Sequence, residues 1–236
     1  MFTTQEVLRY SKQLILDEIG LNGQQKMKDA KVLVIGAGGL GCPVLQYLNA
    51  CGIGTIGVAE FDVVEASNLH RQVLYTPDDI GKKKAVVAIE KLSLQNPFTT
   101  FIHHDIAIDE ANAESILKYY DVVIDGCDNF ATRYIINDLC VALGKTLVYG
   151  SILDYQGQVA IFHHNESKNL RDIFPEAPYA DDVPNCAENG VIGTVPGIIG
   201  TIMAQLAINI ICDIPTIKNQ LLLIDVRTME RTVLHF

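Results

Sequence analysis

The sequence predicts an α/β protein with a doubly wound, mostly parallel sheet and additional antiparallel strands in its C-terminal part. Three observations lead to this prediction. Short runs that are apolar on both faces alternate with helical stretches over residues 1–150, as in parallel sheets covered by helices on each side. A glycine-rich turn follows the first apolar run, and the pattern changes to period two after Tyr155.

Each element of the first 150 residues has a local reason. Thr3 and Glu6 form a capping box, which opens a helix expected to run to about Asp17. Apolar runs predict the buried strands, and amphipathic stretches predict the helices between them. The expected strands are 31–36, 55–60, 99–104, 121–125 and 146–150, and the expected helices are 40–51, 82–95, 110–118 and 129–143.

The remaining residues predict an antiparallel extension. The segment QGQVAIFHH alternates with period two, and LLLIDV and RTVLHF are separated by a short polar turn. Residues 165–189 are rich in Asp, Asn and Pro, a composition and length typical of lids, binding loops or disordered segments. We expect 1–236 to form a single domain, with a core at 1–150 and an extension at 151–236.

Composition and charge exclude several classes of protein. The chain has 236 residues, of which 49% are hydrophobic and 19% charged, so disordered and low-complexity chains are excluded. The net charge of −10 argues against a general DNA-binding protein. The six cysteines show no CxxC pairing, which indicates buried thiols in a reducing compartment, and the cytoplasm is the expected location.

One uncharged stretch is long enough to span a membrane. Val191 to Cys212 contains 22 residues without a charge. Its glycines, its proline and its polar residues Gln205 and Asn209 favour instead a buried helix over about 198–212. We therefore expect no membrane span, and we expect this segment to form core and dimer contacts.

A glycine-rich motif indicates a nucleotide site. GAGGLG at 36–41 directly follows the first strand and opens a helix, so it meets the GxGxxG pattern in its required context. Glycines there allow backbone N–H groups to approach a phosphate at the positive end of the helix. Glu60 ends the second strand, where a carboxylate can accept hydrogen bonds from ribose hydroxyls. These features predict a Rossmann-like adenosine-nucleotide site, although a tight turn without ligand is the alternative.

Basic residues bear on the choice between NAD and ATP. A triphosphate under attack needs cations and usually Mg²⁺, whereas a pyrophosphate can be held by glycine amides. Asn68, Arg71 and Gln72 follow the second strand. Lys82, Lys83 and Lys84 lie at the predicted start of a helix, where cations oppose the helix dipole unless an anion is bound. A solvated lysine cluster is the alternative.

Two acidic residues follow the fourth strand at its carboxyl end, the edge at which open α/β sheets bind ligands. These residues are Asp125 and Asp128. A carboxylate there can hold Mg²⁺ against phosphates. Either residue could instead cap the following turn.

Five motifs occur in a specific order: GAGGLG, FDVVEASNLHRQ, GKKK, DGCDNFATR and NCAENGV. Together they resemble the ThiF/MoeB/HesA family of adenylyltransferases, related to ubiquitin-activating enzymes, over nearly the whole chain. RYSKQ and LILDEIGLNGQQKM are most similar to ThiF, the thiamine-pathway branch. The resemblance implies a homodimer that uses ATP and Mg²⁺ to adenylylate the C-terminal Gly-Gly carboxylate of a ubiquitin-like sulfur carrier protein, releasing pyrophosphate.

The resemblance also implies roles for single residues. Asp128 would hold Mg²⁺, while Arg71 and Lys84 would neutralise charge on the α-phosphate and on the leaving pyrophosphate. Cys186 matches a cysteine that such enzymes can use in sulfur transfer, and a plain loop cysteine is the alternative. The residues implied to bind the nucleotide are Gly36, Gly38, Gly39, Gly41, Glu60, Asn68, Arg71, Gln72, Lys84 and Asn129.

The chain departs from the family pattern in three places. Asn169 and Asp172 stand where the family has the first of two zinc-binding CxxC pairs, so structural zinc is not expected. The 165–189 loop then lacks a metal anchor, and we expect it to be more mobile or to be ordered only by a partner. Lys12 stands where the family has an arginine that reaches across the dimer, so the charge is kept but the bidentate fork is lost.

Other functions remain open from sequence alone. The chain could activate a molybdopterin-synthase carrier, a small carboxylate or a modified tRNA nucleoside. An NAD-dependent oxidoreductase would also have GxGxxG and Glu60, but it has no need of Arg71, Lys84 and Asp128. Lys12 and the missing zinc ligands make a non-catalytic, carrier-binding homologue a third hypothesis.

Overall fold

The computed structural model describes residues 1–178 and 190–236, and an eight-stranded sheet lies at its centre. Its strand order is β3-β2-β1-β4-β5-β6-β7-β8. The parallel strands are β1 (Lys31–Ile35), β2 (Thr55–Ala59), β3 (Thr100–His104), β4 (Val122–Asp125) and β5 (Thr146–Leu153). An antiparallel meander of β6 (Gln156–Phe162), β7 (Gln220–Asp225) and β8 (Glu230–His235) follows. The predicted fold class is confirmed.

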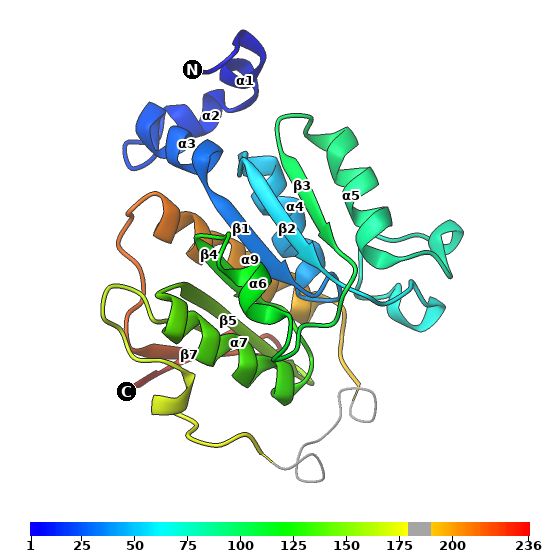
Figure 1. Cartoon of the computed structure of the whole chain (residues 1–236), viewed down its shortest axis with the longest axis vertical. Coiled ribbons are helices and arrows are strands. Elements are labelled where there is room, and N and C mark those ends of the chain that lie inside the picture. Colours follow the sequence, from blue (N-terminus) through cyan, green and yellow to red (C-terminus); the bar gives the residue numbers. More distant parts are fainter. Residues whose placement is uncertain (179–189) are drawn as a thin grey trace.

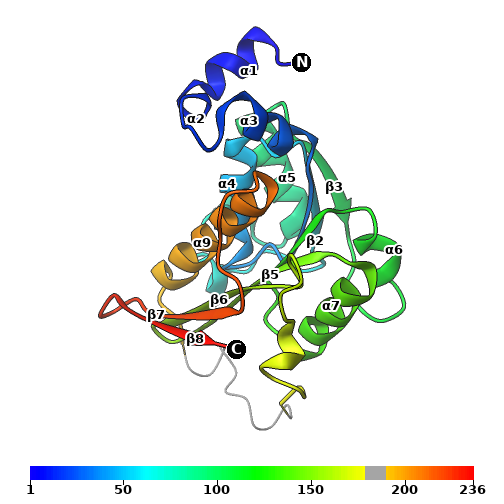
Figure 2. The same cartoon turned by 90° about the vertical axis from the view of Figure 1, so that its left-hand side faces the viewer.

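Helices cover both faces of the sheet, as the side view in Figure 2 shows. One face packs against α4 (Gly41–Cys51), α5 (Lys84–Gln95) and α9 (Thr194–Ile211), and the other against α6 (Ala113–Leu117) and α7 (Phe130–Leu143). Within β1, Val32 and Val34 belong to the first core, and Leu33 and Ile35 to the second. Burial on both faces explains why the strand is apolar from Val32 to Ile35.

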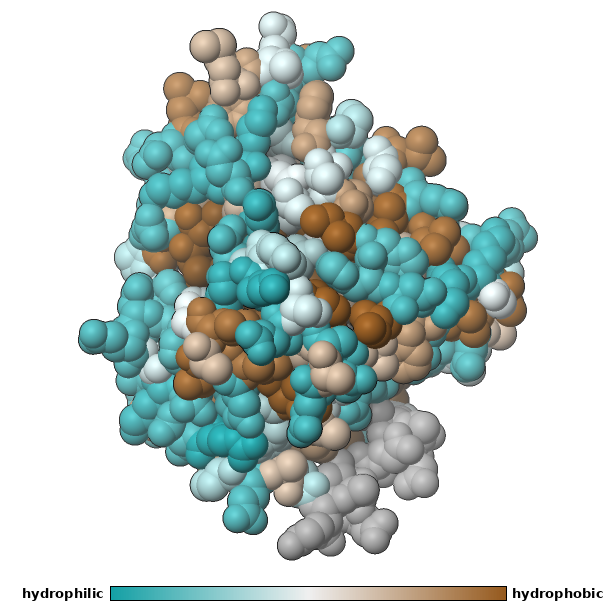
Figure 3. Space-filling model, viewed as in Figure 1, coloured by the Kyte–Doolittle hydropathy of each residue, from teal (hydrophilic) through white to brown (hydrophobic). Residues whose placement is uncertain are grey.

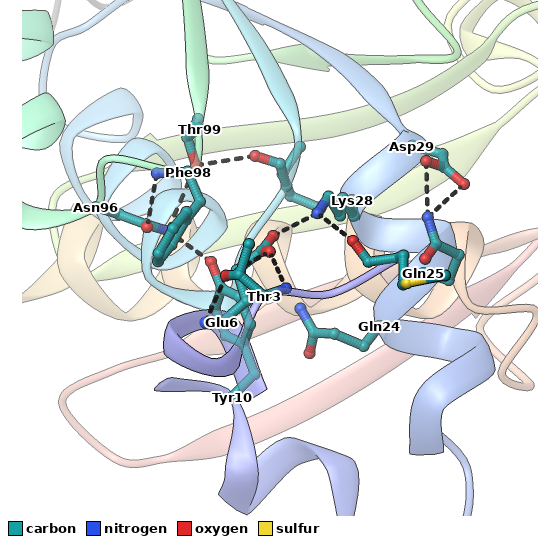
Figure 4. A network of polar contacts seen from close by, with 12 residues as sticks. Thr3, Glu6, Tyr10, Gln24, Gln25, Lys28, Asp29, Asn96, Phe98 and Thr99 are labelled. Atoms are coloured by element: carbon teal, nitrogen blue, oxygen red, sulfur yellow. Dashed lines mark hydrogen bonds and ion pairs between the residues drawn. The ribbon is translucent and has the colours of Figure 1, made fainter. Parts of the chain in front are cut away.

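The N-terminal helix is interrupted, which corrects the prediction of one helix to Asp17. The capping box is present, since Glu6 N donates to Thr3 Oγ1 (3.2 Å) and Thr3 N donates to Glu6 Oε2 (2.8 Å). The chain then forms α1 (Thr4–Arg9) and α2 (Ser11–Leu14), separated at Tyr10. Tyr10 is buried, and its hydroxyl accepts a hydrogen bond from Asn96 Nδ2 (2.9 Å; Figure 4). Asn96 lies 86 residues further along the chain, and its hydrogen bond holds Tyr10 at the break between α1 and α2.

Several element boundaries also differ from those predicted. A further helix, α3 (Gly20–Asp29), was not predicted. Strand β5 continues to Leu153, and α6 begins only at Ala113. Helix α9 begins at Thr194, four residues earlier than expected, and includes Pro196 in its first turn. Proline is tolerated there because the first N–H groups of a helix have no intrahelical partner.

Helix α9 packs one side against β5 and β6. Among the described residues it is the one helix long and apolar enough to span a membrane, and half of it is buried inside the fold. The sheet makes room for it at two glycines, because a Cβ on Gly150 would collide with Met203 and one on Gly157 with Ile199. The expected core role of this segment is confirmed for that side.

The surface is mostly polar on the face drawn in Figure 3. Apolar side chains form separate patches between the polar ones there.

A buried carboxylate before α5 gives a pH-dependent contribution to stability. Asp79 is 6% exposed, and it accepts hydrogen bonds from Lys91 Nζ and from Thr76 N (2.9 Å) and Oγ1 (2.9 Å). Burial alone would raise the pKa of Asp79, but these bonds outweigh burial and hold its pKa well below the usual value. The ionised carboxylate therefore stabilises the fold above the unfolded-state pKa of about 4, and this is lost as the pH falls towards the folded-state pKa.

We therefore expect Asp79→Asn to lower the free energy of unfolding at neutral pH by about 2 kcal/mol, because Lys91 loses its charged partner. The difference between wild type and variant should shrink below about pH 4. Urea unfolding at neutral and acidic pH measures it, with the exposed Asp78→Asn as control. A difference that does not change with pH would contradict the expected pKa.

Candidate nucleotide-binding site

The strand order reverses between β1 and β4, and this creates the crevice in which doubly wound sheets bind ligands. The loops after these two strands touch each other. Gly126 N donates to Ile35 O (2.9 Å), and a Cβ on Gly36 would lie 2.8 Å from Gly126 O. Since Gly36 also has a φ of +88°, this position requires glycine. Figure 1 shows β1 and β4 side by side at the centre of the sheet.

The glycine loop is held firmly by its surroundings. Ala37 O accepts a hydrogen bond from the Tyr75 hydroxyl (2.8 Å), and Ala37 N donates to Glu60 Oε2 (2.9 Å). A Cβ on Gly41 would collide with the carbonyl of Gly36, so the turn closes only with glycine there. The loop leads directly into the 11-residue helix α4, whose N-terminus favours an anion.

Glu60 is buried beside this loop and accepts three backbone hydrogen bonds. Besides Ala37 N, Phe61 N (2.8 Å) and Asp62 N (2.9 Å) donate to its Oε1. The carboxylate therefore fixes the glycine loop relative to the end of β2. Its predicted hydrogen bonds to ribose stay a prediction, and each carboxylate oxygen has lone pairs in addition to those already used.

Replacing Glu60 by glutamine tests this anchoring. The amide keeps one oxygen acceptor and gains donors, so at least one of the three backbone N–H groups that donate to Glu60 loses its acceptor. We expect the free energy of unfolding to fall by about 1–3 kcal/mol and the Kd for ATP to rise. Urea unfolding and calorimetric ATP titration measure the two effects, with the exposed Glu90→Gln as control. Unchanged stability and affinity would contradict the role.

Arg71 and Gln72 lie over the glycine loop. A Cβ on Gly39 would be 3.8 Å from Arg71 Cδ, and a Cβ on Gly38 would be 3.4 Å from Gln72 Nε2. Arg71 is half-buried, and its Nη2 donates to Asn68 Oδ1 (2.8 Å), so Asn68 orients the guanidinium. Gln72 is buried, and its Oε1 has no hydrogen-bond partner among the described residues.

The three lysines before α5 differ in burial. The Lys84 side chain is 6% exposed, and its Nζ lies 3.1 Å from Asp62 Oδ2 at the carboxyl end of β2. Lys82 and Lys83 are exposed and pair with Asp79 (3.5 Å) and Asp105 (3.0 Å). The alternative of solvated lysines therefore fits Lys82 and Lys83. Lys84, in contrast, is a buried cation at the carboxyl edge of the sheet, the edge from which the glycine loop also extends.

The acidic residues after β4 also differ. Asp125 is fully buried, pairs with Arg133 Nε (2.9 Å) and accepts a hydrogen bond from Cys127 N (3.0 Å), so the turn-capping alternative is correct for it. Asp128 is exposed and has no hydrogen bond or ion pair within residues 1–178 and 190–236. Asn129 caps α7 by accepting a hydrogen bond from Thr132 N (2.9 Å). An exposed carboxylate without a partner in this part of the chain, two residues after the Gly126 that contacts the glycine loop, fits Mg²⁺.

Lys12 is not brought to this crevice in a single chain. It is exposed on α2, and its neighbour Gln13 donates to Cys51 O (3.0 Å) at the C-terminal end of α4. The glycine loop lies at the other end of that helix, about 16 Å away at 1.5 Å per residue.

Two further predictions concern the C-terminal half. Cys186 lies outside the described residues. Asn169 and Asp172, at the zinc-ligand positions, instead form a capping box, in which Asp172 Oδ2 accepts hydrogen bonds from Asn169 N (2.8 Å) and Nδ2 (2.9 Å). That the chain lacks structural zinc stays a prediction.

Two described cysteines lie beside the crevice and are held as thiols. Burial raises the pKa of Cys42 to about 12. Burial and the nearby Asp125 carboxylate raise the pKa of Cys127 well above its usual value. Since the thiolate is the nucleophilic form, these pKa shifts disfavour both cysteines as nucleophiles.

Sequence reasoning missed three residues that organise the site: Asp62, Tyr75 and Arg133. Arg133 offers the clearest signal, because it lies in a helix rich in apolar residues, and an arginine that such a helix buries needs a polar partner. Asp62 and Tyr75 have no local signal, since each acts on a residue more than twenty positions away.

The glycine loop at a topological switch point, the cations Arg71 and Lys84, and an Asp128 that is unpaired among the described residues define an α/β protein whose crevice is suited to a phosphate-rich ligand. The model of the ThiF family matches residues 10–236, and the chain belongs to this family. The recognition made from its motifs is thereby confirmed.

The chain is similar to several curated adenylyltransferases. It is 47% identical to the sulfur carrier protein adenylyltransferase of Thermus thermophilus over 218 residues, which cover 90% of this chain and 80% of that protein. It is 43% identical to the probable adenylyltransferase/sulfurtransferase MoeZ of Mycobacterium tuberculosis, with 97% of this chain matched to 60% of that protein. It spans half of the Xenopus laevis adenylyltransferase and sulfurtransferase MOCS3, at 43% identity. The prediction of an adenylyltransferase is confirmed.

Solved structures share the fold at lower identity. The crystal structure of Escherichia coli MccB with MccA-N7isoAsn has a TM-score of 0.86 and 22% identity, covering 96% of this chain and 72% of that chain. The crystal structure of PaaA has a TM-score of 0.84 and 20% identity, covering 99% and 74%. At this identity the likeness concerns the fold.

Proposed function

We propose that the chain adenylylates the C-terminal carboxylate of a ubiquitin-like sulfur carrier protein ending in Gly-Gly, using ATP and Mg²⁺ and releasing pyrophosphate. The observation that supports this most directly is the placement of two cations. Arg71 lies over the glycine loop, and Lys84 is buried against Asp62, whose N–H donates to the same Glu60 carboxylate that anchors the loop. A hydride-transfer site has no need of these cations, whereas displacement at a triphosphate does. The name of the Thermus thermophilus relative supports the substrate class.

The chemistry fits these residues. The carrier carboxylate is already a nucleophile, so no general base is required. Its oxygen forms a bond to the α-phosphorus while the bond between that phosphorus and the bridging oxygen breaks, and pyrophosphate leaves with the electron pair. Glycine-loop amides and Gln72 hold the phosphates, and Arg71 and Lys84 stabilise the charge that develops in the transition state.

Asp128 would hold Mg²⁺ at this site. The ion would supply charge neutralisation on the phosphates. The chain's own part is to present one unpaired carboxylate beside the loop that binds them.

The working unit would be a homodimer in the cytoplasm, in which Lys12 of one chain reaches the crevice of the other. Cys186 would take part in transferring sulfur to the carrier. Thiamine thiazole biosynthesis is the proposed pathway, and activation of a molybdopterin-synthase carrier is the second candidate, favoured by the similarity to MoeZ and MOCS3.

ATP–pyrophosphate exchange tests the proposal. The assay would contain Mg²⁺ and either no carrier, a thiamine-pathway carrier, a molybdopterin-synthase carrier, or the same carriers without their terminal Gly-Gly. Exchange that requires an intact carrier tail supports carboxylate adenylylation, and the preferred carrier assigns the pathway. No exchange with any carrier, despite ATP binding, would contradict the catalytic proposal and favour a binding homologue.

A further inference from the structure

One buried charged side chain near the crevice makes three hydrogen bonds and is not among the predicted site residues. Arg133, on α7, is 4% exposed. Its Nε donates to Asp125 Oδ2 (2.9 Å), and its Nη2 donates to Cys127 O (2.9 Å) and Gly150 O (3.1 Å). The guanidinium also lies 4.9 Å from the ring centroid of Tyr149. Arg133 thereby ties the loop after β4 to strand β5.

The bond to Cys127 O bears directly on Asp128. The carbonyl of Cys127 and the N–H of Asp128 belong to one planar peptide unit. A donor that holds this carbonyl in place therefore also fixes the orientation of the peptide plane that contains the backbone nitrogen of Asp128. On the other side, Asn129 is fixed as the cap of α7. Asp128 thus has a rigid residue before and after it, while its own carboxylate has no partner among the described residues.

The same segment is fixed at its start. The Asp125 carboxylate bridges Arg133 and Cys127 N, and Gly126 N donates to Ile35 O at the end of β1. The position of Asp128 relative to the glycine loop is therefore set by the Arg133 fork and by one backbone bond to β1. A lysine at 133 could keep the ion pair with Asp125, but it could not hold two carbonyls in the same planar geometry.

We propose that Arg133 is a positioning residue for Asp128, so that metal affinity at this site depends on a side chain that contacts neither metal nor nucleotide. The inference rests on the proposed role of Asp128. Groups that orient a metal ligand typically change metal affinity by about 10–100-fold when removed. The expected effect of Arg133→Lys is therefore a rise of about 10-fold or more in the Kd for Mn²⁺ in the presence of ATP.

The test uses Mn²⁺ as the probe and measures binding by electron paramagnetic resonance, without turnover. Arg133→Lys is compared with Arg171→Lys, a matched control on an exposed pair in which Arg171 Nε and Nη2 each donate to Asp138 at 2.7 Å. ATP affinity without metal and thermal stability are measured on the same samples. Weaker Mn²⁺ binding in Arg133→Lys alone, with metal-free ATP affinity kept, is the expected result.

A double-mutant cycle separates the two claims. If Asp128→Asn weakens Mn²⁺ binding, Arg133→Lys should add little in that background, because both act through one carboxylate. If Asp128→Asn leaves Mn²⁺ binding unchanged, the proposed metal role fails. If Asp128→Asn weakens binding but a folded Arg133→Lys lowers only thermal stability, the positioning role alone is overturned. Should Arg133→Lys not fold, Asp125→Asn loosens the same loop and takes its place. It too should weaken Mn²⁺ binding while keeping the metal-free ATP affinity.

Discussion

Replacing Arg71 by alanine is expected to reduce ATP–pyrophosphate exchange by about 100-fold or more, the loss typical when one preorganised charge-stabilising donor is removed. The residue lies over Gly39, and Asn68 Oδ1 holds its guanidinium in place (2.8 Å). Half-burial beside the crevice makes its charge less screened than a surface charge. Arg71→Lys should recover part of the activity, because lysine keeps the charge but not the fork.

Exchange rates at saturating carrier measure this effect, with ATP affinity determined separately. Arg231→Ala, an exposed cation on β8, is the control and should leave exchange unchanged. Stability should change little in Arg71→Ala, since the contacts of its guanidinium, Ser67 O, Asn68 Oδ1 and His70 Nε2, belong to residues that are exposed or half-buried. Exchange at the wild-type rate in Arg71→Ala would remove this cation from the mechanism.

The second large effect is expected for Asp128→Asn. The amide has nearly the same shape but no charge, so we expect exchange to fall by about 100-fold and the Mg²⁺ concentration for half-maximal rate to rise. Stability should stay within about 0.5 kcal/mol of wild type, because the exposed carboxylate makes no contact in the described part of the chain. Kinetic loss without loss of stability would identify a functional rather than a structural carboxylate.

Titration of exchange activity with Mg²⁺ is the measurement, and thermal unfolding accompanies it. Asp78→Asn, which changes an exposed aspartate that is not among the proposed site residues, is the control. An unchanged Mg²⁺ response in Asp128→Asn would show that the metal, if used, is held by the phosphates alone.

The strands and the glycine loop could be predicted because their causes are local. KVLVIG is apolar on both faces, and the glycines after it close a turn that no larger residue could close. Helix α3 could not be predicted in this way, because GLNGQQKMKD is polar and contains two glycines. It is held by tertiary packing, including a close approach of Gly23 to Cys212, far away in sequence. Such tertiary contacts can outweigh the low intrinsic helix propensity of a segment.

The site shows the same division. Motif spacing correctly predicted that Arg71 and Gln72 lie at the glycine loop, and it placed Lys84 near the carboxyl end of the same strand, where it pairs with Asp62. It could not decide between a metal-binding and a capping role for Asp125, since its partner Arg133 is met only when α7 folds back along the sheet. Nor could it reveal that Glu60 is already bonded to three backbone groups.

The placement of Lys12 has a kinetic consequence. Because the length of α4 separates this side chain from the glycine loop of its own chain, any assistance it gives must come from another molecule. The reaction would then be second order in protein when the chains are dilute. Specific activity would fall on dilution, while the affinity of each chain for ATP alone would not.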